Sequence, residues 1–137
     1  MELIALGYLG GVFWLLKGAT PAQKRRIGGA FSLLIATFII GSLWIRYQTG
    51  FFRLSRMEWY NADGSIPLGK WAIPWYIVFV LLLLLLILFR VIQKIKTMPA
   101  NKRWLPFVLA VFFTLVYLAV AYFSLFFVFF LFFPFAP

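Results

Sequence analysis

The chain carries very few residues that could take part in acid–base or nucleophilic chemistry. It contains three acidic residues, no histidine and no cysteine. Two of the acids, Glu58 and Asp63, lie five residues apart, and paired carboxylates can serve as acid and base or bind a cation. The Asn, Asp and Gly residues before Ser65 are, however, typical of a turn. We interpret this stretch as a polar turn rather than as a site.

The shortage of ligand residues bears on cofactors and catalysis together. Haem, copper and iron–sulfur groups are held mainly by His and Cys, and a nucleophile needs an activating base beside it. A proton relay through a membrane uses Asp, Glu or His at depth, and the third acid, Glu2, precedes the first apolar run. We therefore expect no enzyme activity, no catalytic residue, no cofactor and no metal.

Composition indicates that lipid surrounds most of this protein. Hydrophobic residues make up 65% of the 137 residues and charged residues only 12%, and the mean hydropathy is +1.01. Soluble domains are about half apolar, so a soluble core of this size could not hide so much apolar surface. The sequence predicts an integral membrane protein without a soluble domain.

The apolar residues form four segments, at residues 3–16, 27–45, 71–89 and 105–133. They predict an all-α bundle of four transmembrane helices in a single membrane domain covering residues 1–137. The first segment is short against the roughly 20 residues of a typical crossing, so it either spans or lies in the interface. Pro21 after Thr20 suits a capped helix start, and we place Pro74 and Pro106 in the first turns of the last two helices.

The basic residues predict the orientation. The net charge of +10 would suggest nucleic-acid binding in a soluble protein, but short cytoplasmic loops of membrane proteins collect Lys and Arg. We expect no nucleic-acid partner, a bacterial inner membrane location and both termini outside the cytoplasm. Nine of the thirteen basic residues fall in the first and third loops: Lys17, Lys24, Arg25, Arg26, Arg90, Lys94, Lys96, Lys102 and Arg103.

The tightest basic cluster and the outer loop each carry a further expectation. Lys24, Arg25 and Arg26 form the tightest basic cluster, which is a candidate contact for anionic lipid headgroups or an acidic cytoplasmic partner. Residues 46–70 form the outer loop. Within it, the apolar residues from Phe51 to Trp59 interleave with arginines, as in a helix lying among the headgroups.

Small and hydroxylated residues suggest how the helices pack. Gly7 and Gly11 have the four-residue spacing that allows close helix approach, and Gly28, Ser32 and Ala36 continue that spacing in the second segment. We expect the two stripes to pack on each other. Hydroxyls at depth act as interhelical hydrogen-bond donors; the candidates are Tyr8, Ser32, Thr37, Thr114, Tyr117, Tyr122 and Ser124.

The end of the last segment is rich in phenylalanine and continues past the length that a crossing needs. Counting from Leu105, about 20 residues reach Leu125, and tilt of the helix accommodates part of the excess. The alternative is that these rings pack against a partner subunit or tightly held lipid. The residues concerned are Phe126, Phe127, Phe129, Phe130, Phe132, Phe133 and Phe135.

These observations favour a non-catalytic accessory or structural subunit of a larger membrane complex, acting through helix packing, lipid exclusion or assembly. Its partners would be other membrane subunits and lipids with anionic headgroups. Two alternatives stay open. One is a small membrane regulator or immunity protein that binds its partner through the outer loop, and the other is a component of an oligomeric transporter or channel.

Overall fold

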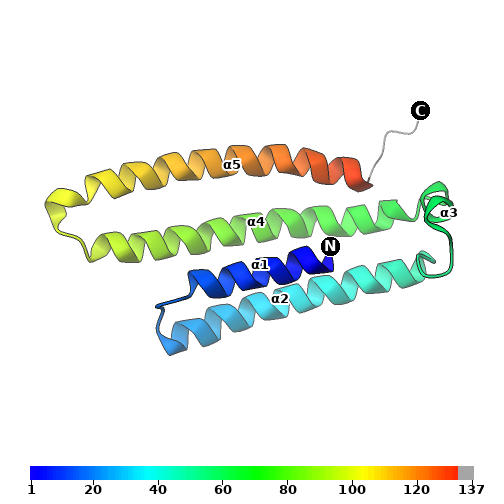
Figure 1. The fold of residues 1–137 in the computed structure, drawn as a ribbon, viewed down its shortest axis with the longest axis horizontal. Helices are drawn as coiled ribbons and strands as arrows, with labels where there is room; N and C mark the ends of the chain where they lie inside the picture. The colour runs from blue at the N-terminus through cyan, green and yellow to red at the C-terminus, as the bar shows by residue number, and fades with distance from the viewer. Residues whose placement is uncertain (133–137) are drawn as a thin grey trace.

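The computed structural model describes residues 1–132, which form long helices lying side by side (Figure 1). No strand occurs among the described residues. The helix α3 joins α2 to α4 at one end of the molecule, and the turn η1 joins α4 to α5 at the other (Figure 1). In chain order the elements are α1 (Glu2–Leu15), α2 (Pro21–Gln48), α3 (Arg56–Asn61), α4 (Ser65–Lys96), η1 (Ala100–Lys102) and α5 (Trp104–Phe132).

Three of these helical segments are long and apolar enough to cross a membrane. They are α2, α4 and the segment Ala100–Phe130, which contains most of α5. The helix α1 has 14 residues and is about 21 Å long at 1.5 Å per residue, against a hydrocarbon thickness of about 30 Å. The described residues are thus all-helical as predicted, with three segments long and apolar enough to span a membrane, and the fourth crossing stays a prediction.

Two helices, α2 and α4, extend well beyond the apolar segments that predict them. Thr20 caps α2 by accepting a hydrogen bond from the Gln23 backbone N–H, with Pro21 at the first helical position, as predicted. Placing Pro74 in a first turn is wrong, because α4 begins at Ser65 and Pro74 lies inside it. Hydropathy marks only the hydrocarbon portion of a helix, whereas backbone hydrogen bonding continues into the headgroup region.

The hairpin of α1 and α2 is held by one face of α1. Ala5, Val12 and Leu16 are buried there, at spacings that repeat on one side of a helix. Val12 and Leu16 share a cluster with Phe31 of α2 and Leu86 of α4. This short helix therefore packs into the angle between α2 and α4.

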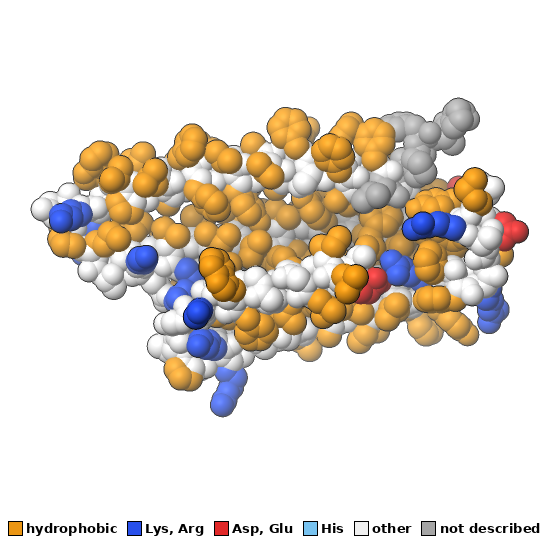
Figure 2. Space-filling view, viewed as in Figure 1, with side chains coloured by type: hydrophobic (Ala, Val, Ile, Leu, Met, Phe, Trp, Pro, Cys, Tyr) orange, Lys and Arg blue, Asp and Glu red, His pale blue; other side chains and the backbone are white. Residues whose placement is uncertain are grey.

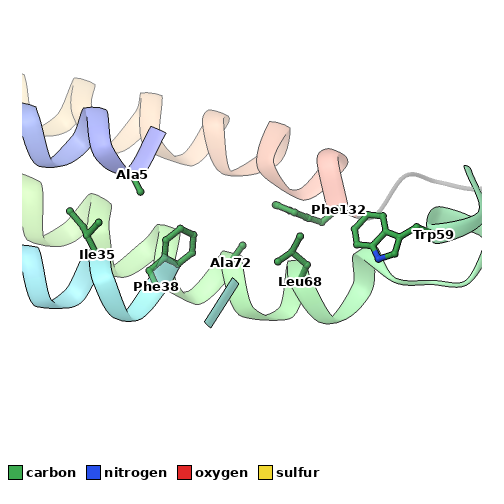
Figure 3. Close-up of a cluster of buried hydrophobic side chains, with 7 residues drawn as sticks. All are labelled: Ala5, Ile35, Phe38, Trp59, Leu68, Ala72 and Phe132. Atoms are coloured by element: carbon green, nitrogen blue, oxygen red, sulfur yellow. The ribbon is translucent and has the colours of Figure 1, made fainter. Parts of the chain in front are cut away.

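A second cluster joins α1, α2 and α4 to the outer loop and the end of α5. Figure 3 shows Ala5, Ile35 and Phe38 at one end of it, with Trp59 and Phe132 at the other. Both Trp59 and Phe132 are buried. The last helical residue described is thus fixed against the outer loop.

The arrangement is open on one side. Among the described residues α5 packs along α4, whereas α1 packs mainly on α2 and less extensively on α4. The helix α5 therefore forms an outer layer, on the far side of α4 from α2 (Figure 1). In the space-filling view α4 is recessed between α5 and α1 (Figure 2).

Candidate functional site

A groove of about 540 Å³ lies between α1, α4 and α5 and reaches the outer loop. Its floor follows α4 from Leu68 to Leu83, a distance of about 22 Å at 1.5 Å per residue. Most of its lining is aliphatic or aromatic, and its charged residues are Arg46 and Arg56. The groove is therefore apolar along its length and basic at one end.

Tyrosines join the three helices around the middle of the groove. The Tyr8 hydroxyl of α1 donates to the Phe79 carbonyl of α4 at 2.8 Å, and the Tyr117 hydroxyl of α5 donates to the Val80 carbonyl at 2.9 Å. Phe79 also contacts the Tyr8 ring, with centroids 5.1 Å apart. Both hydroxyls thus donate to backbone carbonyls, and the apolar faces of the two rings line the groove.

Tyr76 of α4 links that helix to α5 nearer the outer end. Its hydroxyl lies 3.2 Å from the Ala121 carbonyl and is hydrogen bonded to the Ser124 hydroxyl. Tyr76 was not among the predicted hydroxyl donors, because it lies among the bulky residues of the third apolar segment. A tyrosine one turn inside an interfacial tryptophan, here Trp71, is the sequence signal that could have identified it.

The predicted hydroxyl donors behave in two ways. Tyr8, Tyr117 and Ser124 join helices. Thr37 and Thr114 instead donate to carbonyls four residues earlier in their own helices. Two predicted donors remain: Ser32 is half-buried and Tyr122 is 74% exposed.

An ion pair lies at the basic end of the groove. Arg46, near the end of α2, places Nη1 3.0 Å from Oε1 of Glu2 at the start of α1, and the Ser42 hydroxyl lies 3.4 Å from the same carboxylate oxygen. The guanidinium also lies 5.0 Å from the Phe51 ring centroid. Its Nε is buried without a hydrogen-bond partner among the described residues.

The pairing of Glu2 with Arg46 was not predicted. The signal was available, because one lone acid and one arginine end the outer sides of two consecutive apolar segments. In a helical hairpin these two positions meet. Arg56 adds a second guanidinium to the groove lining and makes no ion pair within the described part of the chain.

The outer loop is held in shape by a capping box at α3. The Ser55 hydroxyl accepts from the Glu58 backbone N–H, and the Glu58 carboxylate accepts from the Ser55 backbone N–H at 2.9 Å. The hydrogen bonds from the Ser55 backbone and hydroxyl hold the pKa of Glu58 below its usual range. Helix forms only from Arg56 to Asn61, so the headgroup helix expected from Phe51 is shorter than predicted.

The short helix α3 positions Trp59 over the mouth of the groove. The indole Nε1 donates to the Thr49 hydroxyl at 3.0 Å, and the ring packs against Phe51 and Tyr60. Gly64 lies in contact with this indole, so that a Cβ there would collide with it. The turn predicted after Asn61 is present, with Asp63 at φ 55°.

At the opposite end, two of the basic residues cap helices. Arg90 donates from Nε to the Leu15 carbonyl at 3.1 Å and from Nη2 to the Lys17 carbonyl at 3.0 Å. Arg103 donates to the Met98 and Lys96 carbonyls. Lys24, Arg25 and Arg26 are exposed in the first turns of α2. Figure 2 shows basic side chains gathered at this end of the molecule.

The small-residue stripes do not meet in the way expected. A Cβ at Gly7 or Gly11 would find no atom within 4 Å, so these glycines do not lie in the contact between α1 and α2. Gly28 does, since a Cβ there would lie 2.8 Å from the Phe13 ring. In the same stripe Ser32 is half-buried and Ala36 exposed. The rotation of α1 is set by its larger residues, which occupy the space against α2.

The phenylalanine-rich end divides between surface and core. Phe126, Phe127, Phe129 and Phe130 are exposed on α5. Phe132 is 7% exposed and packs inside this chain, which corrects its assignment to an intermolecular surface. Phe133 and Phe135 lie outside the described residues.

Within the described residues, no three side chains of Asp, Glu, His or Cys come together as a metal site would require. The arrangement offers apolar volume, guanidinium groups and hydroxyls already bonded to backbone. Comparison with known protein families, curated proteins and solved structures finds no match to this chain.

Proposed function

We propose that this chain is a non-catalytic accessory subunit of a larger membrane complex, and that it joins the complex through the outer half of α5. The observation that carries the proposal is the position of the exposed phenylalanines relative to α4. Phe123, Phe126 and Phe127 are between 61% and 71% exposed. They lie on a helix whose extensive packing among the described helices is with α4.

The hydrogen bonds between α4 and α5 fix the depth of these rings. The two helices run antiparallel, with Tyr117 opposite Val80 and Tyr76 opposite Ala121. Continuing this register places Phe127 about level with Lys70, an exposed charged residue. Lys70 belongs at the headgroup level, where a lone helix facing water and headgroups would be polar. Bulky rings at this height are instead suited to a protein partner.

We also propose that α1 crosses the membrane as a fourth helix, with both termini outside the cytoplasm. Glu2 is paired with Arg46 just beyond the apolar run of α2. Leu15 is held by Arg90 just beyond the apolar run of α4. Local thinning of the bilayer accommodates a helix shorter than the hydrocarbon thickness. The concentration of basic residues at the Arg90 end favours the cytoplasmic side for that end, in a bacterial inner membrane.

The interface is tested by a matched pair of triple variants on one helix. Phe123, Phe126 and Phe127 are changed to Ala in the first, and Phe107, Phe112 and Phe113 in the second. All six rings are exposed on α5. After extraction in mild detergent, the first variant is expected to lose most of its co-purifying membrane partners at unchanged insertion, while the second keeps them. Equal recovery from both variants would show that the rings face lipid.

A further inference from the structure

We propose that the groove between α1, α4 and α5 binds one anionic phospholipid, with an acyl chain along α4 and its phosphate at Arg46 and Arg56. This inference does not depend on a partner at α5. It rests on the size of the groove, the charge at its outer end and its opening toward the bilayer.

The size of the groove fits one chain. Its volume of about 540 Å³ falls within the range of roughly 300–1,000 Å³ that holds a single small ligand. Its floor from Leu68 to Leu83 is about 22 Å long, and one leaflet of hydrocarbon is about 15 Å deep. An acyl chain that enters from the outer surface therefore has room to lie fully inside it.

The groove lining suits a hydrocarbon chain for most of its length. Tyr8, Tyr76 and Tyr117 direct their hydroxyls to backbone or side-chain partners on α4 and α5. Their rings, together with Phe79 and Val80, form the apolar lining. These tyrosine hydroxyls therefore have no proton free to donate to a polar ligand.

The charge at the outer end fits a phosphodiester. Two guanidinium groups, of Arg46 and Arg56, stand against the single carboxylate of Glu2. The amino group of Met1, 3.6 Å from Glu2 Oε2, adds a further positive charge, so positive charge is in excess at this end. A phospholipid without a cationic headgroup carries one negative charge on its phosphate. The Nε of Arg46 has no partner among the described residues, and arginine binds phosphate through several donors at once.

The groove opens sideways as a phospholipid requires. Among the described residues α1 and α5 do not pack against each other as α4 and α5 do, so their separation gives access from the bilayer (Figure 2). One acyl chain then lies inside the groove while the second remains among bulk lipid. A closed cavity of this volume would exclude a two-chain lipid.

Lipid titration of the purified, delipidated full-length protein tests the proposal. Native mass spectrometry measures the affinity for dioleoyl phosphatidylglycerol, dioleoyl phosphatidylcholine and oleate, with inorganic phosphate as a competitor. We expect one phosphatidylglycerol per chain, bound several-fold more tightly than phosphatidylcholine or oleate, and no displacement by phosphate. Equal binding of phosphatidylcholine or oleate, or displacement by phosphate, would overturn the assignment.

Matched variants separate the headgroup from the acyl chain. Removing one arginine near a membrane surface weakens anion binding about fivefold. We therefore expect that loss for Arg56→Gln and none for Arg53→Gln, since Arg53 is outside the groove lining. Val80→Phe fills the groove and is expected to abolish binding, whereas Val78→Phe on the exposed side of α4 is not. Equal lipid binding by the two arginine variants would refute the headgroup contact. Equal lipid binding by the two valine variants would refute the acyl-chain contact.

A photoreactive lipid keeps the proposal testable if Val80→Phe does not fold. Phosphatidylglycerol with a diazirine in its acyl chain is photolysed with the wild-type protein. We expect crosslinks at groove residues such as Tyr76, Phe79 and Leu83. Crosslinks confined to the exposed face of α5 would overturn the site.

Discussion

Tyr8 and Tyr117, on two different helices, donate hydrogen bonds to neighbouring carbonyls of α4, those of Phe79 and Val80, at 2.8 and 2.9 Å. A carbonyl in a helix keeps a second lone pair after accepting its own backbone hydrogen bond. The pair of tyrosines therefore joins α1 and α5 to one turn of α4 without interrupting it.

These hydroxyls are expected to stabilise the packing of α1 and α5 on α4. Tyr8→Phe and Tyr117→Phe are each expected to lower the free energy of unfolding by about 0.6 kcal/mol, the mean for interhelical hydrogen bonds in a membrane. Detergent-driven unfolding measures this change. Tyr122→Phe is the control, because Tyr122 is 74% exposed and its hydroxyl makes no hydrogen bond within the described chain. Losses equal to that of the control would mean that the two bonds contribute nothing.

A substitution of Arg90 can distinguish its role in stabilising the fold from its role in setting the orientation in the membrane. Arg90→Lys keeps the positive charge but loses the forked contact with the Leu15 and Lys17 carbonyls. We expect orientation to be unchanged while the free energy of unfolding falls by about 1.5–3 kcal/mol, the range for a hydrogen bond to a charged group. Arg25→Lys, at an exposed position, should have no effect. An unchanged unfolding curve for Arg90→Lys would contradict the capping role.

The ion pair at the opposite end of α1 predicts a charge-swap rescue. Glu2→Gln is expected to weaken docking of α1 by about 1.5–3 kcal/mol, because the partly buried Arg46 loses its partner. The double change Glu2→Arg with Arg46→Glu should recover part of this loss. Recovery is incomplete, since Arg46 also lies over the Phe51 ring. The accessibility of a cysteine introduced at Leu9 measures how firmly α1 is docked. If Glu2→Gln does not increase the accessibility of that cysteine, the prediction is wrong.

The capping box predicts a pH dependence confined to acid. The pKa of Glu58 is lower in the folded protein than the ordinary value of about 4.3. Its stabilisation of α3 is therefore complete above pH 4.3 and is lost as the pH falls through the lower, folded pKa. The NMR shift of the Ser55 amide, which donates to Glu58, should follow this titration. A shift that moves between pH 6 and 8 would exclude Glu58 as the titrating group.

Neutralising both outer acids tests whether they form a site. Glu58→Gln with Asp63→Asn is expected to leave the protein inserted and folded at neutral pH, with stability lowered only by what the ionised Glu58 carboxylate adds to α3. Gln keeps an acceptor for the Ser55 amide, and Asn tolerates the φ of 55° at position 63. Thermal unfolding in detergent measures stability. Loss of partner recovery with normal folding would make this loop a binding site.

The apolar segments of the sequence predicted the apolar parts of the helices. They did not predict how far each helix continues beyond its apolar part. They located the apolar cores of the four longer helices and the cap at Thr20. They placed the start of α4 too late, because Ser65 to Lys70 are helical but not part of the hydrophobic run. The apolar segments also did not predict how α1 is rotated about its own axis. Gly7 and Gly11 have the spacing for close approach, yet Val12 and Leu16 occupy the contact face.

The candidate site could be predicted only in fragments. Tyr8 and Tyr117 were identified as buried donors from their depth. The groove needs the relative positions of three helices, and no spacing along the chain contains that information. Phe132 illustrates the limit, since nothing in its sequence context distinguishes it from Phe127, yet only Phe132 reaches the cluster with Trp59.

The contact of Arg90 with the end of α1 has a consequence for how the chain is made. The carbonyls of Leu15 and Lys17 receive their donors from a residue more than 70 positions later. While the ribosome is still completing α4, those carbonyls have only water and headgroups as partners, although α1 can already pack on α2 and pair Glu2 with Arg46. The Leu15 end of α1 is therefore capped only after Arg90 has been synthesised and inserted, so the two ends of this helix are fixed at different stages of synthesis.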